Sequence, residues 1–337
     1  MGFDLSRRDF VALLAAAAVG ALADKSPVAQ GMNMGVCVYS YGRGRFKDAM
    51  EFLSYCHELG ASGVQVGLGV DPKMSAKVGE KAQQWGMYVE GQVGMPKADA
   101  DAAKFEAELV AAKAAGAQVV RGAMLSGRRY ETFSTAEEFK TFAAESWKAL
   151  ERAEPILRKH QLKLALENHK DWRVPELIAM MEKIGSEWVG ICIDTGNSIA
   201  LLEEPEHVVE AYANWGTSCH IKDMGVKEYE DGFLLSEVPL GMGFLDVRRM
   251  ISIMRKANPK IQFNLEMITR DPLRIPCLTK KYWAVMEGAK GEELAATISM
   301  VRAKASKELP GVAGMSEEEK AKFEERNVRE SFEYLKG

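Results

Sequence analysis

Short apolar runs alternate with longer amphipathic segments along most of the chain. The runs are rich in valine, isoleucine and leucine, which is typical of strands buried on both faces of a parallel sheet. The segments between them repeat apolar residues every three or four positions, which predicts helices packed on one face. We expect strands at residues 34–40, 63–68, 87–93, 118–124, 162–168, 189–195, 217–222 and 261–267.

Eight strand–helix units in 337 residues predict an α/β fold, a (β/α)8 TIM barrel. A doubly wound sheet is the competing arrangement. No G-x-G-x-x-G motif follows the first expected strand, so the usual signature of a dinucleotide-binding sheet is missing. We therefore expect one barrel domain over residues 24–337.

Two segments near the C-terminus do not fit the repeating units. Residues 269–314 are too long for a simple loop, contain three prolines and leave directly from the strand that carries Glu266. This insert could lie over or beside the barrel mouth, pack on the outer wall, or pack against a neighbouring subunit of a homo-oligomer. Residues 316–337 are amphipathic and charged, which predicts a closing helix with Val328, Phe332 and Leu335 facing inward.

The first residues have the pattern of an export signal. Residues 6–10 read SRRDF and precede an apolar stretch, residues 11–23, that ends in a small-x-small motif. This combination predicts a twin-arginine signal peptide over residues 1–23, cleaved before Asp24, and a periplasmic or otherwise exported protein. A short anchor helix is the alternative, but the stretch is well below the roughly 20 residues that span a bilayer.

Charge and cysteine content exclude several classes of protein. The chain has 44 Lys and Arg against 48 Asp and Glu, with a net charge of −4, so it lacks the basic excess of a nucleic-acid-binding protein. Its five cysteines form no C-x-x-C motif, which argues against a disulfide framework and against a thiolate metal site. We expect Cys37, Cys192 and Cys219, inside strands, to behave as small apolar residues.

Four polar residues stand at the carboxyl ends of expected strands: Glu167, Asp194, His220 and Glu266. In a barrel of parallel strands these ends open onto one face, so the four side chains are expected to meet there. Three carboxylates and one imidazole suit a single Mn, Co, Zn or Mg ion. Three of these residues also have structural alternatives: a buried ion pair for Glu167, a turn or helix cap for Asp194, and a core position for His220.

The motifs around these residues occur in a characteristic order. They are E-x-H from Glu167, D-T-G-N from Asp194, H-I-K-D from His220, G-x-G-x-x-D from Gly241, and L-E ending at Glu266. In this order they resemble the xylose isomerase-like barrels, and within them the sugar phosphate isomerase/epimerase group. The resemblance extends over nearly the whole chain after the signal. It implies one divalent metal ion held by the four strand-end residues, with Glu167 and Glu266 as the catalytic acid/base pair.

The chain departs from this group at positions expected to touch substrate. Ketose epimerases of the group carry a histidine three residues after the aspartate, where this chain has Asn197. They also carry an arginine downstream of the metal histidine, where Lys222 and Lys227 are the nearest cations. These differences leave the metal site intact and make the reaction type less certain than the site.

Substrate contacts are expected from side chains beside or across from the candidate ligands. Lys222 lies two residues after His220, and its alternative is an ion pair with Asp223 or Glu90. Asp246 is expected to cap the helix that follows it. The predicted substrate-binding residues are His169, Lys222, Asn197 and Arg121, with Tyr39, Gln65 and Glu90 as further candidates on the early strands.

These residues predict a metal-dependent isomerase or epimerase that acts on a free sugar or keto-sugar. The metal acidifies the C–H next to a carbonyl, and the two glutamates move the proton through a metal-stabilised enediolate. A lyase or dehydratase that eliminates across a keto-sugar or keto-glycoside is the alternative, and a non-enzymatic sugar-binding barrel is the second. An abasic-DNA endonuclease of the same superfamily needs three metals and more histidines than these strand ends supply.

Overall fold

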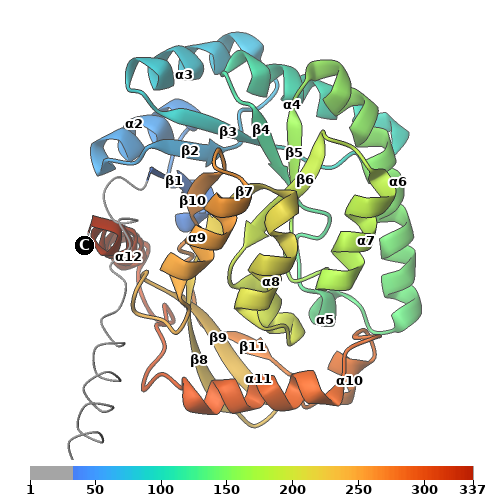
Figure 1. The fold of residues 1–337 in the computed structure, drawn as a ribbon. Coiled ribbons are helices and arrows are strands. Elements are labelled where there is room, and N and C mark those ends of the chain that lie inside the picture. Colours follow the sequence, from blue (N-terminus) through green and yellow to red (C-terminus); the bar gives the residue numbers. More distant parts are fainter. Residues whose placement is uncertain (1–32, 337) are drawn as a thin grey trace, which may run out of the picture.

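Eight parallel strands close into a barrel in the computed structural model, which describes residues 33–336 (Figure 1). The strands follow one another around the barrel, and β10 pairs with β1 to close it. Each strand overlaps a run expected from the sequence, so the (β/α)8 fold is confirmed. The strands are β1 (Met34–Cys37), β2 (Gly63–Val66), β3 (Tyr88–Gln92), β4 (Val119–Gly122), β5 (Lys163–Glu167), β6 (Val189–Asp194), β7 (Gly216–Ile221) and β10 (Gln262–Leu265).

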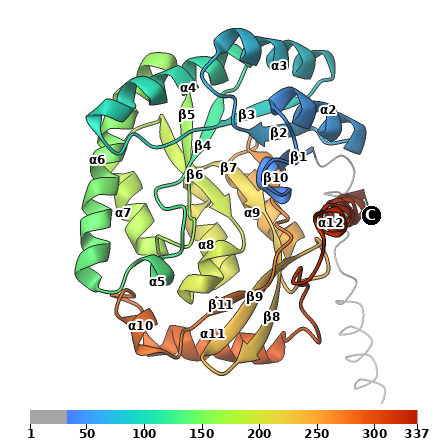
Figure 2. The ribbon, with the colours of Figure 1, turned by 180° about the vertical axis from the view of Figure 1, so that it is seen from behind.

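Helices form a layer around the barrel, and their ends follow local capping signals (Figures 1 and 2). Thr135 and Glu138 form a capping box at the start of α6, and Gly60 ends α2 with a φ of 83°. Asp246 accepts a hydrogen bond from the Arg249 backbone N–H and so caps α9, as expected. These helices are α2 (Ala49–Leu59), α3 (Pro72–Gln84), α4 (Ala102–Ala114), α6 (Ala136–His160), α7 (Val174–Ile184), α8 (Pro205–Tyr212) and α9 (Val247–Ala257).

The C-terminal helix α12 (Glu317–Lys336) lies beside α2 on the side of the barrel (Figure 1). The Tyr55 hydroxyl of α2 donates a hydrogen bond to Glu325 of α12. Val328 and Phe332 are buried, as expected, whereas the side chain of Leu335 and the signal expected over residues 1–23 lie outside the described part of the chain. Within residues 33–336, no helix combines the length and apolar character needed to cross a membrane.

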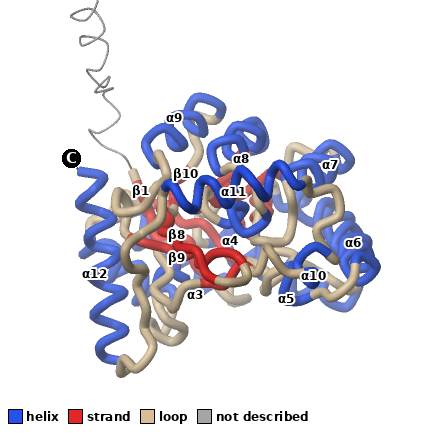
Figure 3. The backbone as a smooth tube through the Cα atoms, turned by 90° about the horizontal axis from the view of Figure 1, so that it is seen from below, coloured by secondary structure: helices blue, strands red, loops and turns tan. Residues whose placement is uncertain are grey.

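A second, three-stranded antiparallel sheet lies at the carboxyl end of the barrel strands (Figures 1 and 3). It consists of β8 (Asp223–Tyr229), β9 (Gly232–Val238) and β11 (Leu273–Ile275), and α11 (Gly291–Ala303) packs against β8 and β9. The β8–β9 hairpin is not among the elements expected from the sequence. Because β8 follows β7 after a single residue, the hairpin extends directly from the strand that carries His220.

The segment expected as an insert, residues 269–314, completes this layer. It supplies β11 and α11, together with the short helix α10 (Lys280–Trp283), which packs against α5 (Arg129–Thr132). Tyr282 is fully buried and its hydroxyl donates to the carbonyl of Ala200, 2.8 Å away. These contacts tie the segment to loops at the carboxyl end of the barrel.

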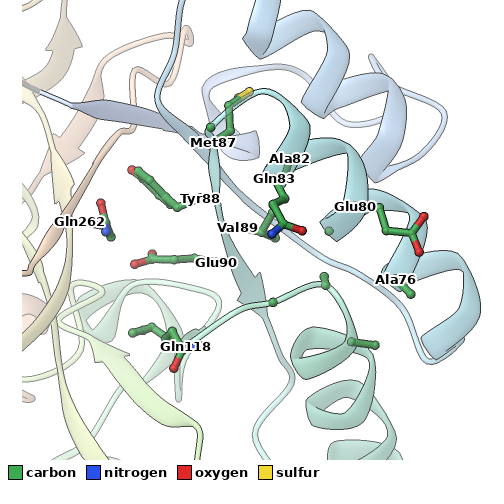
Figure 4. A pocket seen from close by; sticks show the side chains of 16 residues that line it. Ala76, Glu80, Ala82, Gln83, Met87, Tyr88, Val89, Glu90, Gln118 and Gln262 are labelled. Atoms are coloured by element: carbon green, nitrogen blue, oxygen red, sulfur yellow. The ribbon is translucent and has the colours of Figure 1, made fainter.

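A cavity of about 630 Å³ lies at the opposite, amino-terminal end of the barrel, between α3 and α4 (Figure 4). It is lined by the first residues of β3 and β4 and by Gln262 at the start of β10. Gly79 permits the close approach of α3 to α4, because a Cβ there would lie 2.7 Å from the backbone of Ala115. The cavity is therefore on the face that stabilises the fold, away from the strand-end residues.

Tyr88 ties three strands together near this end of the barrel. Its hydroxyl accepts from the Gly35 N–H at 2.9 Å and donates to the Phe263 carbonyl at 2.8 Å. Tyr88→Phe is expected to lower the free energy of unfolding by about 1–3 kcal/mol, because the buried Gly35 N–H loses its partner. Thermal unfolding should show a midpoint a few degrees lower, while an unchanged midpoint would contradict this role.

Candidate metal centre

The four candidate ligands come from four consecutive positions around the barrel. Glu167 ends β5, Asp194 ends β6, His220 lies in β7, and Glu266 directly follows β10. Asp194 and His220 are paired neighbours in the sheet. All four residues are at most 3% exposed, and one potential ligand atom from each lies within 4.8 Å of all the others. The structure therefore brings together the four side chains that the sequence selected.

The imidazole atom Nδ1 of His220 lies among three carboxylate oxygens. It is 3.5 Å from Glu167 Oε1, 3.5 Å from Glu266 Oε1 and 3.7 Å from Asp194 Oδ2, and this buried nitrogen has no hydrogen-bond partner among the described residues. Metal–ligand bonds of about 2.1 Å at angles of 90–120° separate neighbouring ligand atoms by roughly 3.0–3.6 Å. The four residues therefore fit a divalent cation in both donor type and spacing.

The tautomer of His220 is set by residues beneath it. Its other ring nitrogen, Nε2, lies 2.7 Å from Gln65 Oε1, while Gln65 Nε2 donates to Glu90 Oε2 at 3.0 Å. An amide oxygen can only accept, so Nε2 carries a proton, and Nδ1 is the nitrogen that can bind a metal ion when the ring is neutral. Ser218 and Asn264 also donate to Glu90, which fixes this chain of hydrogen bonds. Gln65 and Glu90, expected as further substrate contacts, instead support the candidate ligand.

Gln65→Leu is expected to weaken metal binding by about 10- to 100-fold, because His220 loses the acceptor that orients its ring. Competition with a chelator, followed at equilibrium, measures the change in dissociation constant. Gln83→Leu, on the exposed face of α3, is the matched control and should bind metal like the wild type. Equal affinities for both variants would show that Gln65 does not support the site.

Each candidate glutamate ligand has its second oxygen held by a cation. Arg121 Nε donates to Glu167 Oε2 at 2.6 Å, and Lys222 Nζ lies 2.6 Å from Glu266 Oε2. Burial raises the pKa of Glu167, but the Arg121 guanidinium outweighs it and holds the pKa well below its usual range. Burial also raises the pKa of Glu266, which His220 and Lys222 lower overall. Both side chains are therefore carboxylates at neutral pH.

The structure corrects the expected partner of Lys222. Its ammonium lies 2.9 Å from Asp194 Oδ2, in addition to its contact with Glu266, and forms no ion pair with Asp223 or Glu90. Both carboxylate oxygens of Asp223 instead accept hydrogen bonds from backbone N–H groups. Three of these groups are in the loop after β9, at Gly241, Gly243 and Leu245, and the fourth belongs to the next residue in β8, Met224. Lys222 thus lies against the candidate ligands.

Asp194 and Asn197 link the ligand set to the turn after β6. Asp194 Oδ1 accepts from the backbone N–H groups of Gly196 and Asn197, at 2.9 and 2.7 Å, while Oδ2 faces the centre. The turn and the ligand interpretations of this aspartate are therefore compatible. Asn197 Nδ2 donates to Glu167 Oε1 at 3.1 Å, and its Oδ1 accepts from Lys222 at 3.2 Å. Asn197, predicted to bind substrate, therefore holds the candidate ligand Glu167 and the cation Lys222 by hydrogen bonds.

His169 is half-buried just beyond β5. Its Nδ1 lies 2.9 Å from the Leu125 carbonyl, so it donates a proton there and leaves Nε2 with its lone pair. Burial lowers the pKa of His169 to about 4, so the ring is neutral at pH 7. Tyr39 is 46% exposed, and its ring lies 5.5 Å from the Arg121 guanidinium carbon.

Three charged residues near the centre are not among those predicted from the sequence: Lys170, Glu237 and Arg270. Arg270 donates to both carboxylate oxygens of Glu237, whose Oε1 lies 3.8 Å from Lys222 Nζ. Glu237 belongs to the hairpin that the apolar pattern did not reveal. Lys170 directly follows His169, a predicted substrate-binding residue, and this position in the sequence was the only indication that Lys170 lies near the centre.

Cys37 lies beside this set as a further potential ligand. Cys37 Sγ lies 3.6 Å from Glu266 Oε1, close enough to join a possible metal group with His220. Burial raises the pKa of Cys37, which favours the thiol in the metal-free protein. Cys192 and Cys219 are also buried and unpaired, as expected of small apolar residues.

The fold and the strand-end cluster define a TIM-barrel protein with a candidate metal centre. The chain belongs to the Xylose isomerase-like TIM barrel family, whose model matches residues 53–296. This result confirms the family resemblance drawn from the motifs.

The chain is similar to solved structures, among them an epimerase and a magnesium-bound barrel protein, and to a curated protein. D-psicose 3-epimerase, solved in the presence of D-fructose, has a TM-score of 0.56 and 13% identity, covering 81% of this chain and 97% of that one. A Xylose isomerase-like TIM barrel protein from Mycobacterium smegmatis in complex with magnesium has a TM-score of 0.52 and 15% identity, covering 81% and 100%. At these identities the structures show a shared fold.

The curated protein is 3-oxo-isoapionate decarboxylase from Pectobacterium atrosepticum. It is 35% identical over 94 residues, which are 27% of this chain. The match spans 34% of the length of that relative, about a third.

Proposed function

We propose that the protein is a divalent-metal-dependent enzyme that moves a proton at the carbon next to the carbonyl of a keto-sugar, as an isomerase or epimerase. One observation carries the proposal. The unpartnered Nδ1 of His220 faces oxygens of Glu167, Asp194 and Glu266 at 3.5–3.7 Å. A similar TIM-barrel protein was solved in complex with magnesium, which supports a divalent ion in this protein, and Mn, Co, Zn and Mg are the candidate ions.

The protein groups in this reaction are the two glutamates. A divalent ion held by the four residues would supply Lewis acidity, which lowers the pKa of a C–H next to a carbonyl. Glu167 and Glu266 are carboxylates at neutral pH, so either can accept that proton. If the opposite glutamate has taken up a proton from solvent, it can deliver that proton to the other face of the carbon and invert it, while the first glutamate releases its proton to solvent. Delivery of the abstracted proton to the neighbouring carbon by the first glutamate instead interconverts aldose and ketose. Arg121 and Lys222 hold the two carboxylates in place.

A lyase is the second candidate, and the partial match to a decarboxylase favours it. The same carboxylates and cations could serve a reaction in which a β-leaving group departs, or in which a carboxylate group is lost as carbon dioxide. A cation-rich centre stabilises the negative charge that either reaction develops on oxygen.

Incubation with keto-sugars in heavy water tests the proposal. Metal-loaded protein should incorporate deuterium at the carbon next to the carbonyl of a substrate, which proton NMR detects as loss of one signal. An unsaturated product or released carbon dioxide would identify the lyase. A protein that holds no metal after supplementation would instead be a sugar-binding barrel.

We further propose that the protein is exported by the twin-arginine route. The SRRDF motif and the apolar residues 11–23 support export by this route. Because phosphorylated sugars are mainly cytoplasmic, an exported enzyme of this kind is expected to act on an unphosphorylated substrate.

A further inference from the structure

Lys170 is a buried cation that forms no ion pair with any described residue. It is 3% exposed, and its ammonium donates to the neutral amide oxygen Oδ1 of Asn197. The other buried cations of the centre, Arg121 and Lys222, each contact a carboxylate. A buried charge without a counter-ion costs several kcal/mol. Such a lysine destabilises the unliganded protein unless something else supplies the negative charge.

The backbone at Lys170 is strained and firmly held. Its φ is 55°, in the left-handed region that few residues other than glycine adopt. The Lys170 carbonyl accepts from the Arg129 N–H at 3.1 Å, and Asp171 Oδ1 accepts from the N–H groups of His169 and Trp172 at 2.9 Å. Backbone strain that the surroundings maintain in this way is concentrated at binding and catalytic sites.

The charges around Lys170 leave room for one more anion. Burial, with Lys222 and Arg270 nearby, lowers the pKa of Lys170 to about 7, while Glu237 and Asp194 act in the opposite direction. The nearby carboxylates of Glu237 and Asp194 thus do not fully compensate the charge of the Lys170 ammonium. The carboxylates Glu167, Asp194, Glu237 and Glu266 equal in number the cations Arg121, Lys170, Lys222 and Arg270, but Lys170 alone among these cations has no ion pair with any of the four carboxylates.

A divalent cation held by the candidate ligands would make this balanced group positive. Asp171 offsets the excess only in part, because burial raises the pKa of its carboxyl to about 7. A neutral sugar would leave the excess uncompensated in a buried place. An anionic substrate group would lower it.

We propose that Lys170 binds a carboxylate of the substrate, so that the substrate class is a keto-sugar acid. This inference rests on the proposed function and specifies its substrate. Lys170 and Lys222 share Asn197 Oδ1, and Lys222 lies 2.9 Å from Asp194 Oδ2. Through this shared amide oxygen, Lys170 lies next to a cation that contacts the candidate ligands, so a carboxylate bound by Lys170 would lie close to the candidate metal centre.

Calorimetric titration of the manganese-loaded protein with a matched pair of sugars tests this substrate class. The pair is 5-keto-D-gluconate and L-sorbose, which has a hydroxymethyl group in place of the carboxylate. The acid should bind at least about tenfold more tightly, as expected for a charge-assisted hydrogen bond. Lys170→Gln should remove this preference, and Lys163→Gln, at the exposed start of β5, should retain it. Equal binding of both sugars, or a preference that survives Lys170→Gln, would overturn the inference.

Stability of the free protein gives an independent test. If Lys170 is kept for a ligand, Lys170→Met should raise the thermal midpoint of the metal-free protein, because an unpaired buried charge is removed. A lowered midpoint would mean that the lysine has a structural role and would overturn the inference.

The two proposals can fail separately. A Lys170-dependent preference for the acid without deuterium exchange would retain the substrate class and reject the reaction. Exchange into neutral keto-sugars, with no preference for the acid, would retain the reaction and reject the role of Lys170.

Discussion

Replacing His220 by alanine is expected to remove tightly bound divalent metal from the protein. The substitution deletes the only nitrogen donor of the candidate set and leaves three carboxylates around an enlarged space. Because loss of a residue that merely orients a ligand lowers affinity 10- to 100-fold, loss of the ligand itself should exceed about 100-fold. Elemental analysis should find about one Mn, Co, Zn or Mg ion per wild-type chain and none in the variant.

His207→Ala provides a matched control for this experiment. His207 is exposed on α8 and lies outside the candidate ligand set, so the control should keep its metal. Excess metal should also stabilise the wild type, by about 2.7 kcal/mol when free metal is 100 times its dissociation constant. His220→Ala should show no such stabilisation. A His220→Ala protein that retains one ion per chain would place the metal elsewhere.

Replacing Glu266 by glutamine is expected to lower the rate of deuterium exchange by about 10²- to 10⁴-fold at saturating metal. Glutamine has nearly the same shape but cannot accept the proton as a carboxylate does. Lys222 also loses its nearest partner, at 2.6 Å, and keeps Asp194 at 2.9 Å. The rate is measured by proton NMR with each variant loaded to one metal per chain, so that weaker metal binding does not enter the result.

Glu182→Gln, on the exposed face of α7, is the control and should exchange at the wild-type rate. An unchanged rate in Glu266→Gln would remove this glutamate from the reaction. Glu167 would then be the remaining candidate base, and the lyase, which needs no second base on the opposite face of the carbon, would be favoured over the epimerase.

The sequence by itself determined the fold and the composition of the candidate centre. Buried parallel strands require continuous apolar runs, so eight such runs marked the barrel strands directly. Polar residues at the ends of those runs must lie on one face, because parallel strands all point the same way. Glu167, Asp194, His220 and Glu266 could therefore be selected without knowing which strands are neighbours.

Only the tertiary structure decided how the charges around that centre are paired. Gln65 orients His220 from 155 positions away in the chain, and Arg121 pairs with Glu167 from 46 away. The β8–β9 hairpin, which the apolar pattern did not reveal, brings Glu237 near Lys222, and Lys170 shares Asn197 with that lysine. An apolar pattern reports burial along one strand, whereas hydrogen bonds and ion pairs depend on register and rotamer between strands. The candidate ligands could thus be found from the sequence of each strand alone, whereas the roles of the residues around them depend on contacts between strands.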